Sequence, residues 1–254
     1  MRPRVVLTAC AVCVVAAVTA ACGGSRPTLA SSASSSPTTT APTSTTAAAK
    51  VDTSFVGSAL GPEVAIYASA DTAAPPSQTI ANPNENGAPL VFLLTAPDNG
   101  VADPVEVYLP IRPNGSTGFV KRGDLRITAH QYRVKVEVHA HRITVTKAGA
   151  VIIQEPVGIG TSETPTPGGV FYLKELLKPP NPDGVYGPYA YGLSGYSNVL
   201  TSFAGGDGVI GIHGTNEPSS IGKNVSHGCI RMSNEGITQL AQILPLGTPV
   251  EILP

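Results

Sequence analysis

The sequence predicts a mainly β protein with little helix. Its 254 residues include 27 glycines and 24 prolines but no tryptophan, which is typical of short strands joined by many turns. Val134, Val136 and Val138 alternate with polar residues, and this period of two is typical of a half-buried strand. Other short apolar runs, separated by turn residues, continue the pattern along the chain.

The first segment indicates export. Two arginines precede an almost wholly apolar run at residues 5–18, which is too short for a typical membrane span. Small residues then precede Cys22, as in the lipobox of bacterial lipoproteins. We therefore expect residues 1–21 to be a signal peptide and Cys22 to carry a lipid anchor. Since Thr19 stands where such boxes usually carry leucine, a plain secretory signal cleaved near Ala21 is the alternative.

Residues 22–62 should form a flexible tether. From Gly23 to about Lys50 the chain is Ser, Thr, Ala and Pro with almost no large apolar side chain. Such a segment cannot bury enough surface to offset its ordering entropy. Behind a lipid anchor, the tether would let a folded domain reach from the outer face of the cytoplasmic membrane into the cell wall.

Residues 63–128 are expected to form a small all-β domain. Four apolar runs alternate with turn clusters there: Val64–Tyr67, Leu90–Leu94, Val105–Ile111 and Gly118–Val120. The stretch 112–120 resembles the closing strands of a bacterial SH3-like domain, which implies a wall-binding or spacer module. A β extension packed against the next domain explains the pattern equally well.

Residues 131–254 are the second predicted domain. After the valine strand, further strands are expected at Ile143–Thr146, Val151–Gln154 and Val170–Leu173. The segment Asn234–Leu244 has the helical spacing of apolar residues.

Charge and ligand spacing argue against two classes of function. Charged residues make up 13% of the chain and the formal net charge is −1, so the electrostatic footprint of a nucleic-acid binder is missing. His139 and His141 share one face of a strand near His130, but no carboxylate or cysteine lies at ligand spacing. We expect no nucleic acid, no metal and no cofactor.

Cys229 is the cysteine that needs an explanation. Cys10 and Cys13 fall within the signal peptide and Cys22 would be lipidated, so Cys229 has no partner for an internal disulfide. A buried, inert thiol is the structural alternative. A nucleophilic thiol instead needs an imidazole within reach and cations that lower its pKa from about 8.5.

The neighbours of Cys229 favour a nucleophile. His213 lies sixteen positions earlier (229 − 213), and His227 and Arg231 flank the cysteine. These three side chains are expected to lower the pKa of the thiol. Gly228 leaves backbone N–H groups unobstructed, which suits them to hold an oxyanion.

Around these residues the sequence resembles the YkuD-type L,D-transpeptidases, in an actinobacterial-type lipoprotein. The resemblance covers about Tyr132 to Pro254 and is carried by ordered runs: His213–Asn216, Ser220–Lys223 and Ser226–Met232, with a Thr-Pro-rich turn upstream at Glu163–Tyr172. Gly169 departs from the pattern where a threonine is expected. For residues 131–254 the resemblance implies a YkuD-like β sandwich.

The resemblance implies a cysteine acyltransferase that cross-links peptidoglycan. Cys229 would attack a tetrapeptide stem after its third residue, release D-alanine and pass the acyl group to an amine of another stem. His213 would be the general base and acid, oriented by the Gly214 carbonyl or by Ser226. Transfer to water would make the chain an L,D-carboxypeptidase. Carbapenems are the inhibitors expected to acylate the thiol.

Substrate contacts are implied as well. The N–H groups of Gly228 and Cys229, with His227, would stabilise the oxyanion. Arg231 would hold either a substrate carboxylate or the loop geometry through an ion pair. Tyr191 belongs to an aromatic, glycine-rich segment that either covers the cleft and contacts substrate or only packs.

Two other functions compete with this interpretation. A sortase also uses Cys, His and Arg, but a Thr-Leu-x-Thr-Cys strand should then end at the nucleophile, whereas Ser-His-Gly precedes Cys229 here. A non-catalytic wall-binding lipoprotein would work through residues 63–128, and the intact pair of His213 and Cys229 argues against it.

Overall fold

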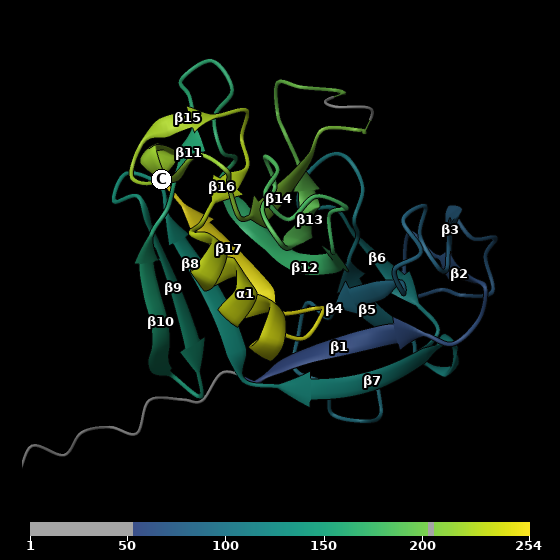
Figure 1. The fold of residues 1–254 in the computed structure, drawn as a ribbon. Helices are drawn as coiled ribbons and strands as arrows, with labels where there is room; N and C mark the ends of the chain where they lie inside the picture. The colour runs from purple at the N-terminus through teal and green to yellow at the C-terminus, as the bar shows by residue number, and fades with distance from the viewer. Residues whose placement is uncertain (1–52, 203–205) are drawn as a thin grey trace, which may run out of the picture. The chain divides into compact units, whose positions relative to one another are not determined.

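Strands dominate the structure, a computed structural model that describes residues 53–202 and 206–254 (Figure 1). The predicted signal peptide, Cys22 and the tether up to residue 52 lie outside the described residues. None of the helices in the described ranges is long and apolar enough to cross a membrane. The predicted mainly β fold with little helix is confirmed.

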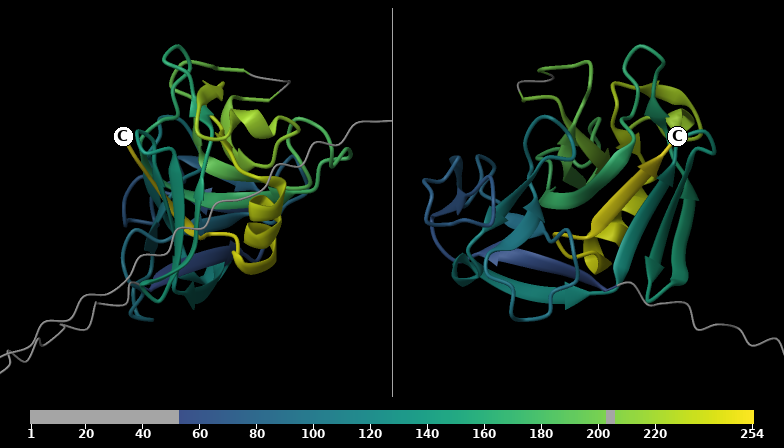
Figure 2. Two further views of the ribbon diagram at one scale, coloured as in Figure 1. Left: turned by 60° about the vertical axis from the view of Figure 1, so that its left-hand side comes forward. Right: turned by 180° about the vertical axis from the view of Figure 1, so that it is seen from behind.

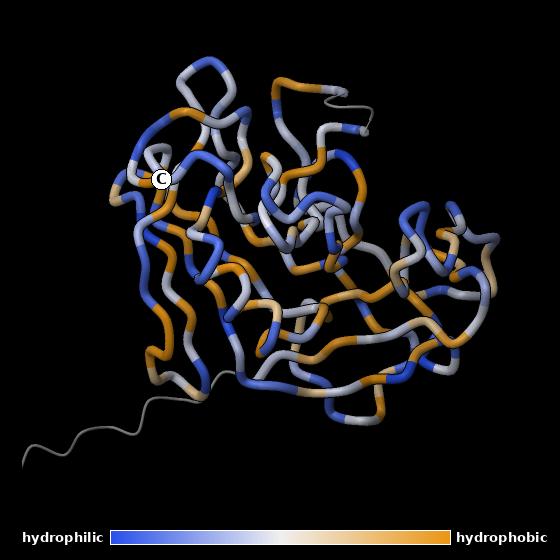
Figure 3. The backbone as a smooth tube through the Cα atoms, in the orientation of Figure 1, coloured by the Kyte–Doolittle hydropathy of each residue, from blue (hydrophilic) through white to orange (hydrophobic). Residues whose placement is uncertain are grey.

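The strands before residue 131 form small antiparallel sheets in which β1 pairs with β4 and β7, β2 with β3, and β5 with β6. Their bounds are β1 Ser54–Ala59, β2 Glu63–Ile66, β3 Gln78–Ala81, β4 Val91–Leu93, β5 Val105–Tyr108, β6 Thr117–Val120, a 3-10 turn Arg122–Asp124, and β7 Leu125–His130. Hydrophobic and polar residues alternate along β5 and β7, whereas β4 is apolar throughout (Figure 3). Inward-facing side chains, among them Phe92, Val107 and Val120, form one buried cluster.

Strand β1 corrects a predicted boundary. It lies inside residues 22–62, which the composition predicts as tether, yet Ser54–Ala59 pairs with β7 along its whole length. Val56 is only 2% exposed, so burial and strand pairing offset the ordering entropy of this segment. The tether prediction is therefore wrong at its C-terminal end.

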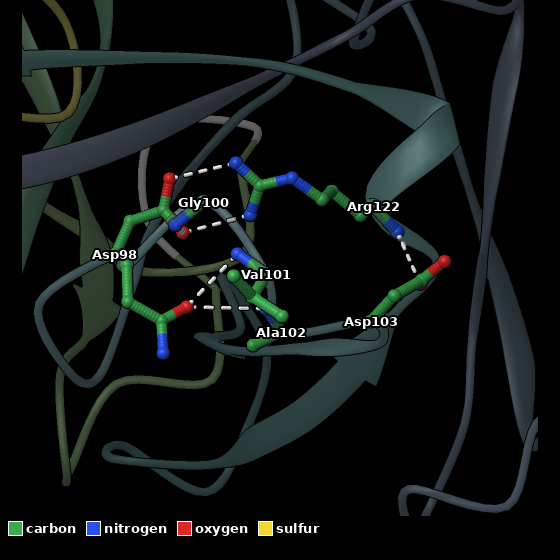
Figure 4. A network of polar contacts seen from close by, with 7 residues as sticks. Asp98, Gly100, Val101, Ala102, Asp103 and Arg122 are labelled. Carbon is green, nitrogen blue, oxygen red and sulfur yellow. Dashed lines mark hydrogen bonds and ion pairs between the residues drawn. The ribbon is translucent and has the colours of Figure 1, made fainter.

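A bidentate ion pair fixes the loop between β4 and β5. The two terminal nitrogens of Arg122 donate to the Asp98 carboxylate at 2.7 and 2.8 Å, and the Arg122 N–H donates to Asp103 Oδ1 at 2.8 Å (Figure 4). The hydrogen bond from Arg122 lowers the pKa of Asp98 to about 2. Paired contacts of this geometry are stronger than single ones, so the loop is held to the turn after β6.

After residue 131 the described chain forms an eight-stranded sheet in the order β10-β9-β8-β17-β12-β13-β14-β16, with β11 and β15 as a separate parallel pair. The bounds are β8 Tyr132–Glu137, β9 Arg142–Lys147, β10 Ala150–Pro156, β11 Ile159–Gly160, β12 Gly169–Leu177, β13 Ala190–Tyr196, β14 Val209–His213, a 3-10 turn Pro218–Ser220, β15 Asn224–Ser226, β16 Ile230–Arg231 and β17 Pro249–Leu253. The C-terminal strand β17 is thus central, parallel to β8 and antiparallel to β12.

Helix α1 (Asn234–Ile243) packs beside this sheet (Figure 2). It begins where Ser233 Oγ accepts the Gly236 N–H at 2.9 Å, an N-cap that satisfies a backbone donor of the first turn. Ile237 and Leu240 are fully buried in the core cluster of the sheet. The predicted helix from Asn234 is confirmed, ending within one residue of the expected Leu244.

The upstream strands pack directly on β12. Tyr172 of β12 is fully buried in a cluster with Val56, Val91 and Leu93. Arg112 also reaches across: its terminal nitrogens donate to carbonyl oxygens of the segment after β13, namely those of Ser197 (2.7 Å), Leu200 (2.9 Å) and Asp207 (2.9 Å). These contacts hold a segment that follows the central strands of the sheet.

Candidate active site

Two neighbouring strands bring the predicted histidine and cysteine together. β14 and β16 pair in parallel, with Ile212 opposite Ile230 and His213 opposite Arg231. Cys229 directly precedes β16 and lies beside Gly211. A methyl group at position 211 would be 3.9 Å from Cys229 Sγ and 4.0 Å from His213 Cδ2, so both side chains flank the same small gap.

The His213 imidazole is buried and oriented by the backbone. Its Nδ1 lies 2.6 Å from the Gly214 carbonyl oxygen, which can only accept, so Nδ1 carries the proton and Nε2 is left as the basic atom. Burial lowers the pKa of His213 to about 4; the bond to Gly214 opposes this and the Arg231 charge adds to it. At neutral pH the ring is an uncharged base.

Cys229 is partly exposed, and its thiol is protonated at neutral pH. Burial raises the pKa of Cys229, while a hydrogen bond with the Gly211 backbone and the Arg231 charge lower it by less. Of the cations expected to lower the pKa of the thiol, Arg231 does so, but the protein around the sulfur raises the pKa by more, even though the residue is partly exposed. The resting pair is a thiol beside a neutral imidazole.

Ser226 fixes the turn before the cysteine and does not orient His213. Its Oγ donates to the Cys229 carbonyl oxygen at 2.6 Å and accepts the Gly228 N–H at 3.1 Å. Of the two orienting groups expected, the Gly214 carbonyl is the one in contact. The Gly228 N–H already has a partner, which removes one of the two expected oxyanion donors. Gly228 itself has a φ of 115°, a conformation that favours glycine.

Arg231 makes an ion pair beside the site. Its Nη1 donates to Glu217 Oε2 at 3.1 Å, while its Nε is buried without a hydrogen-bond partner among the described residues. Its charge favours the thiolate of Cys229 and disfavours an imidazolium at His213. Its ion pair agrees with the predicted loop-fixing role. His227 lies exposed on the neighbouring loop.

The structure adds residues that the sequence pattern did not single out. The ring of Tyr186 meets His213 edge-on, with centroids 4.9 Å apart. Burial raises the pKa of Tyr186, and the nearby Cys229 adds to this. Asn234 Oδ1 accepts the Thr215 N–H at 2.8 Å. The sequence did offer a signal for Asn234, because Ser233 and Asn234 are typical of a helix start. No sequence pattern pointed to Gly211.

Comparison with known proteins assigns this part of the chain to a family. The family model of the YkuD L,D-transpeptidase catalytic domain matches residues 131–252. Residues 131–252 are a YkuD-family domain. Within it lie both His213 and Cys229, and the predicted family resemblance is confirmed.

Curated relatives of the YkuD domain carry the same family name. The chain is 38% identical over 123 residues to "Putative L,D-transpeptidase YkuD" of Bacillus licheniformis, covering 48% of this chain and 66% of the relative. The corresponding protein of Bacillus subtilis is 39% identical over 121 residues, with 48% and 65% covered. The chain thus spans just under two thirds of each of these relatives.

Solved structures similar to this chain include Bdellovibrio bacteriovorus Bd1075, with 27% identity, a TM-score of 0.39 and coverage of 49% of this chain and 47% of that chain. L,D-transpeptidase 3 from Mycobacterium tuberculosis, solved with a faropenem-derived adduct, has 16% identity, a TM-score of 0.40 and coverage of 61% and 93%.

Tyr191 is a core residue of the YkuD domain. It is fully buried on β13, and its hydroxyl lies 2.9 Å from the carbonyl oxygen of Leu244, directly after α1, and 3.1 Å from that of Leu240 in the helix. A side chain so enclosed cannot contact a substrate, so the expected substrate-binding role of Tyr191 is wrong. The half-buried Tyr186 is the tyrosine of this segment that lies at the site.

The histidines outside the site have other partners. The His141 ring contacts Asn224 Oδ1 at 2.5 Å, and His130 Nδ1 accepts the Tyr132 N–H at 3.3 Å. In the part of the chain that the structure describes, no three His, Cys, Asp or Glu side chains group as metal ligands would.

Proposed function

We propose that this chain is an L,D-transpeptidase that cross-links peptidoglycan through a thioester on Cys229. The register of β14 and β16 carries the proposal, because it brings a partly exposed thiol to a buried, neutral imidazole. The family match over residues 131–252 supports the same chemistry. The acyl donor is a tetrapeptide stem and the acceptor is an amine of a neighbouring stem.

In the first half of the reaction, Nε2 of His213 takes the thiol proton as the sulfur of Cys229 attacks the carbonyl carbon after the third stem residue. A C–S bond forms and the carbonyl oxygen becomes an oxyanion. With the Gly228 N–H bonded to Ser226, the Cys229 N–H is the backbone donor assigned to that oxyanion. Collapse breaks the amide bond, and the His213 proton passes to the amine of the departing D-alanine.

In the second half, the acceptor amine attacks the thioester carbon and gives its proton to His213. The C–S bond breaks, and the sulfur recovers the proton. One amide bond is lost and one is formed, so the exchange needs no oxidant or external energy source. Attack by water in place of the amine would give the carboxypeptidase alternative.

Mass analysis of the purified chain with a disaccharide tetrapeptide tests this proposal, with Cys229→Ala as the control. We expect loss of D-alanine and a cross-linked dimer, both absent with the control. Tripeptide alone would support the carboxypeptidase, and no product at all would favour the wall-binding lipoprotein.

We further propose that the chain is exported and lipid-anchored at Cys22, on the outer face of the cytoplasmic membrane. The apolar run before Cys22 and the small residues around it support this location. Cys22→Ala should move the protein from the membrane fraction to the soluble exported fraction. Unchanged membrane association would contradict the anchor.

A further inference from the structure

Asn234 stands where α1 meets the two segments that flank His213. It is the first residue of the helix, directly after the N-cap Ser233. Ser233 Oγ also donates to Glu155 Oε2 at 3.3 Å, which ties the start of the helix to β10. The Asn234 side chain therefore projects from an anchored point.

The first segment that Asn234 holds is the turn after β14. Its Oδ1 accepts the Thr215 N–H at 2.8 Å, and Thr215 is two residues beyond His213. The intervening Gly214 supplies the carbonyl that binds His213 Nδ1. A Cβ at Gly214 would collide with the same Asn234 oxygen, so the amide is packed against the peptide that orients the imidazole.

The second segment carries Tyr186. Gly187 has a φ of 64°, and a Cβ there would also collide with Asn234 Oδ1. The preceding Tyr186 places its ring against His213. The Oδ1 of Asn234 thus lies against two segments. One is the Gly214 peptide, whose carbonyl binds the imidazole, and the other is the turn at Gly187 that carries Tyr186.

We propose that Asn234 is a positioning residue that holds the His213 imidazole toward Cys229 by fixing the Gly214 carbonyl and the Tyr186 turn. It acts through the acceptor oxygen of its side chain and does not touch the reacting atoms. The proposal deepens the proposed function, because it concerns the base of the same cysteine.

The fold should survive loss of this side chain. The Met232 N–H donates to the His213 carbonyl oxygen at 2.8 Å, so the strands of the site stay joined without Asn234. The Ser233 cap and the buried Ile237 hold the helix independently. Asn234→Ala removes the acceptor, Asn234→Asp keeps an acceptor oxygen, and Glu235→Gln changes the exposed neighbour as a control.

The rate at which iodoacetamide alkylates Cys229 at pH 7 measures the reactivity of the thiol with its base, and it needs no wall substrate. A lower rate in His213→Ala first establishes that this rate depends on the base. We expect Asn234→Ala to react about tenfold more slowly, a fraction of the usual contribution of a general base. Asn234→Asp should react within about threefold of the unchanged chain, and Glu235→Gln at its rate. An unchanged rate in Asn234→Ala, or equally slow reaction of Asn234→Asp, would overturn the proposal.

The pH profile supplies a second readout that a purely structural residue would not move. The carboxylate of Asn234→Asp would lie against Gly214, the residue after His213, and should raise the pKa of His213, so the acid limb of alkylation should move to higher pH. If Asn234→Ala does not fold, the shift of the acid limb in Asn234→Asp is the remaining test. An acid limb at the same pH as in the unchanged chain would then overturn the proposal. Failure of the unchanged chain to process tetrapeptide would defeat the transpeptidase assignment, while the alkylation comparison would still decide the role of Asn234.

Discussion

His213 Nδ1 and the Gly214 carbonyl oxygen lie 2.6 Å apart, so the imidazole of His213 is oriented by the residue that follows it in the chain. A backbone carbonyl cannot be removed by changing a side chain, and it carries no charge that would raise the basicity of the ring as a carboxylate does. Burial is consequently the largest influence on the pKa of His213, and it keeps the ring neutral.

The pH dependence of Cys229 acylation should reflect this neutral base. Because burial lowers the pKa of His213 to about 4, the rate of acylation by a carbapenem should hold from pH 7 to about 5. It should then fall about tenfold per unit below about pH 4. Stopped-flow acylation, with circular dichroism to show that the fold persists, measures this. If the acylation rate instead fell near the ordinary pKa of histidine, the His213 ring would be in contact with water.

Gly211→Ala should block the site while leaving the fold largely intact. The added methyl would lie 2.9 Å from the Tyr191 carbonyl oxygen and 3.9 Å from Cys229 Sγ, forcing β14 or the thiol to shift. A shift of about 1 Å costs on the order of 100-fold in rate. Gly123→Ala, with nothing within 4 Å of the added methyl, is the matched control and should acylate normally.

Ser226→Ala should lower both stability and rate. It leaves the Gly228 N–H and the Cys229 carbonyl without their hydroxyl partner, which should cost about 1–3 kcal/mol of unfolding free energy. Urea unfolding and carbapenem acylation are measured together, with the exposed Ser219→Ala as control. Unchanged acylation in Ser226→Ala would show that the turn does not need this hydroxyl.

Tyr191→Phe separates a core role from a substrate role. Loss of its hydroxyl removes the contacts with the Leu240 and Leu244 carbonyls and should lower the unfolding free energy by about 1 kcal/mol. The KM for tetrapeptide and the acylation rate should not change. A raised KM with unchanged stability would restore the substrate-binding interpretation.

Arg122→Gln should destabilise the chain at pH 7 and much less at pH 2 and below. The pKa of Asp98 in the folded chain, about 2, is below its ordinary 3.8, so the pair stabilises the fold above about pH 4. That contribution is lost as the pH falls through about 2. The melting temperatures of Arg122→Gln and the unchanged chain should converge in acid, whereas Arg126→Gln, an exposed control on β7, should differ at neither pH.

Sequence patterns predicted the strands whose side chains alternate, such as β8, and the helix whose apolar residues follow a helical period. They missed β13, which places Tyr191 in the core. Gly192 and Gly195 give that strand little β propensity. The Glu175 side chain nevertheless packs where a Cβ of residue 192 would be, and Phe171 packs where a Cβ of residue 195 would be. Such a strand is specified by its neighbours, and a local pattern cannot reveal it.

The chemistry of the site was predictable in part. The spacing of His213 and Cys229 pointed to the pair, since reactive residue types leave a signature. The protonation states did not follow from composition, because the cations near Cys229 suggested a lowered pKa while its burial raises it. The contacts of Asn234 depend on where a helix begins in space, and no spacing along the chain encodes them.

The burial of Tyr172 against Val56, Val91 and Leu93 means that the boundary of the family domain is not a place where the chain can be cut. A fragment beginning at residue 131 would expose that ring to water and release the segment that Arg112 holds. Residues 54–130 are therefore part of the folding unit that carries the YkuD domain, and a soluble fragment should begin before β1.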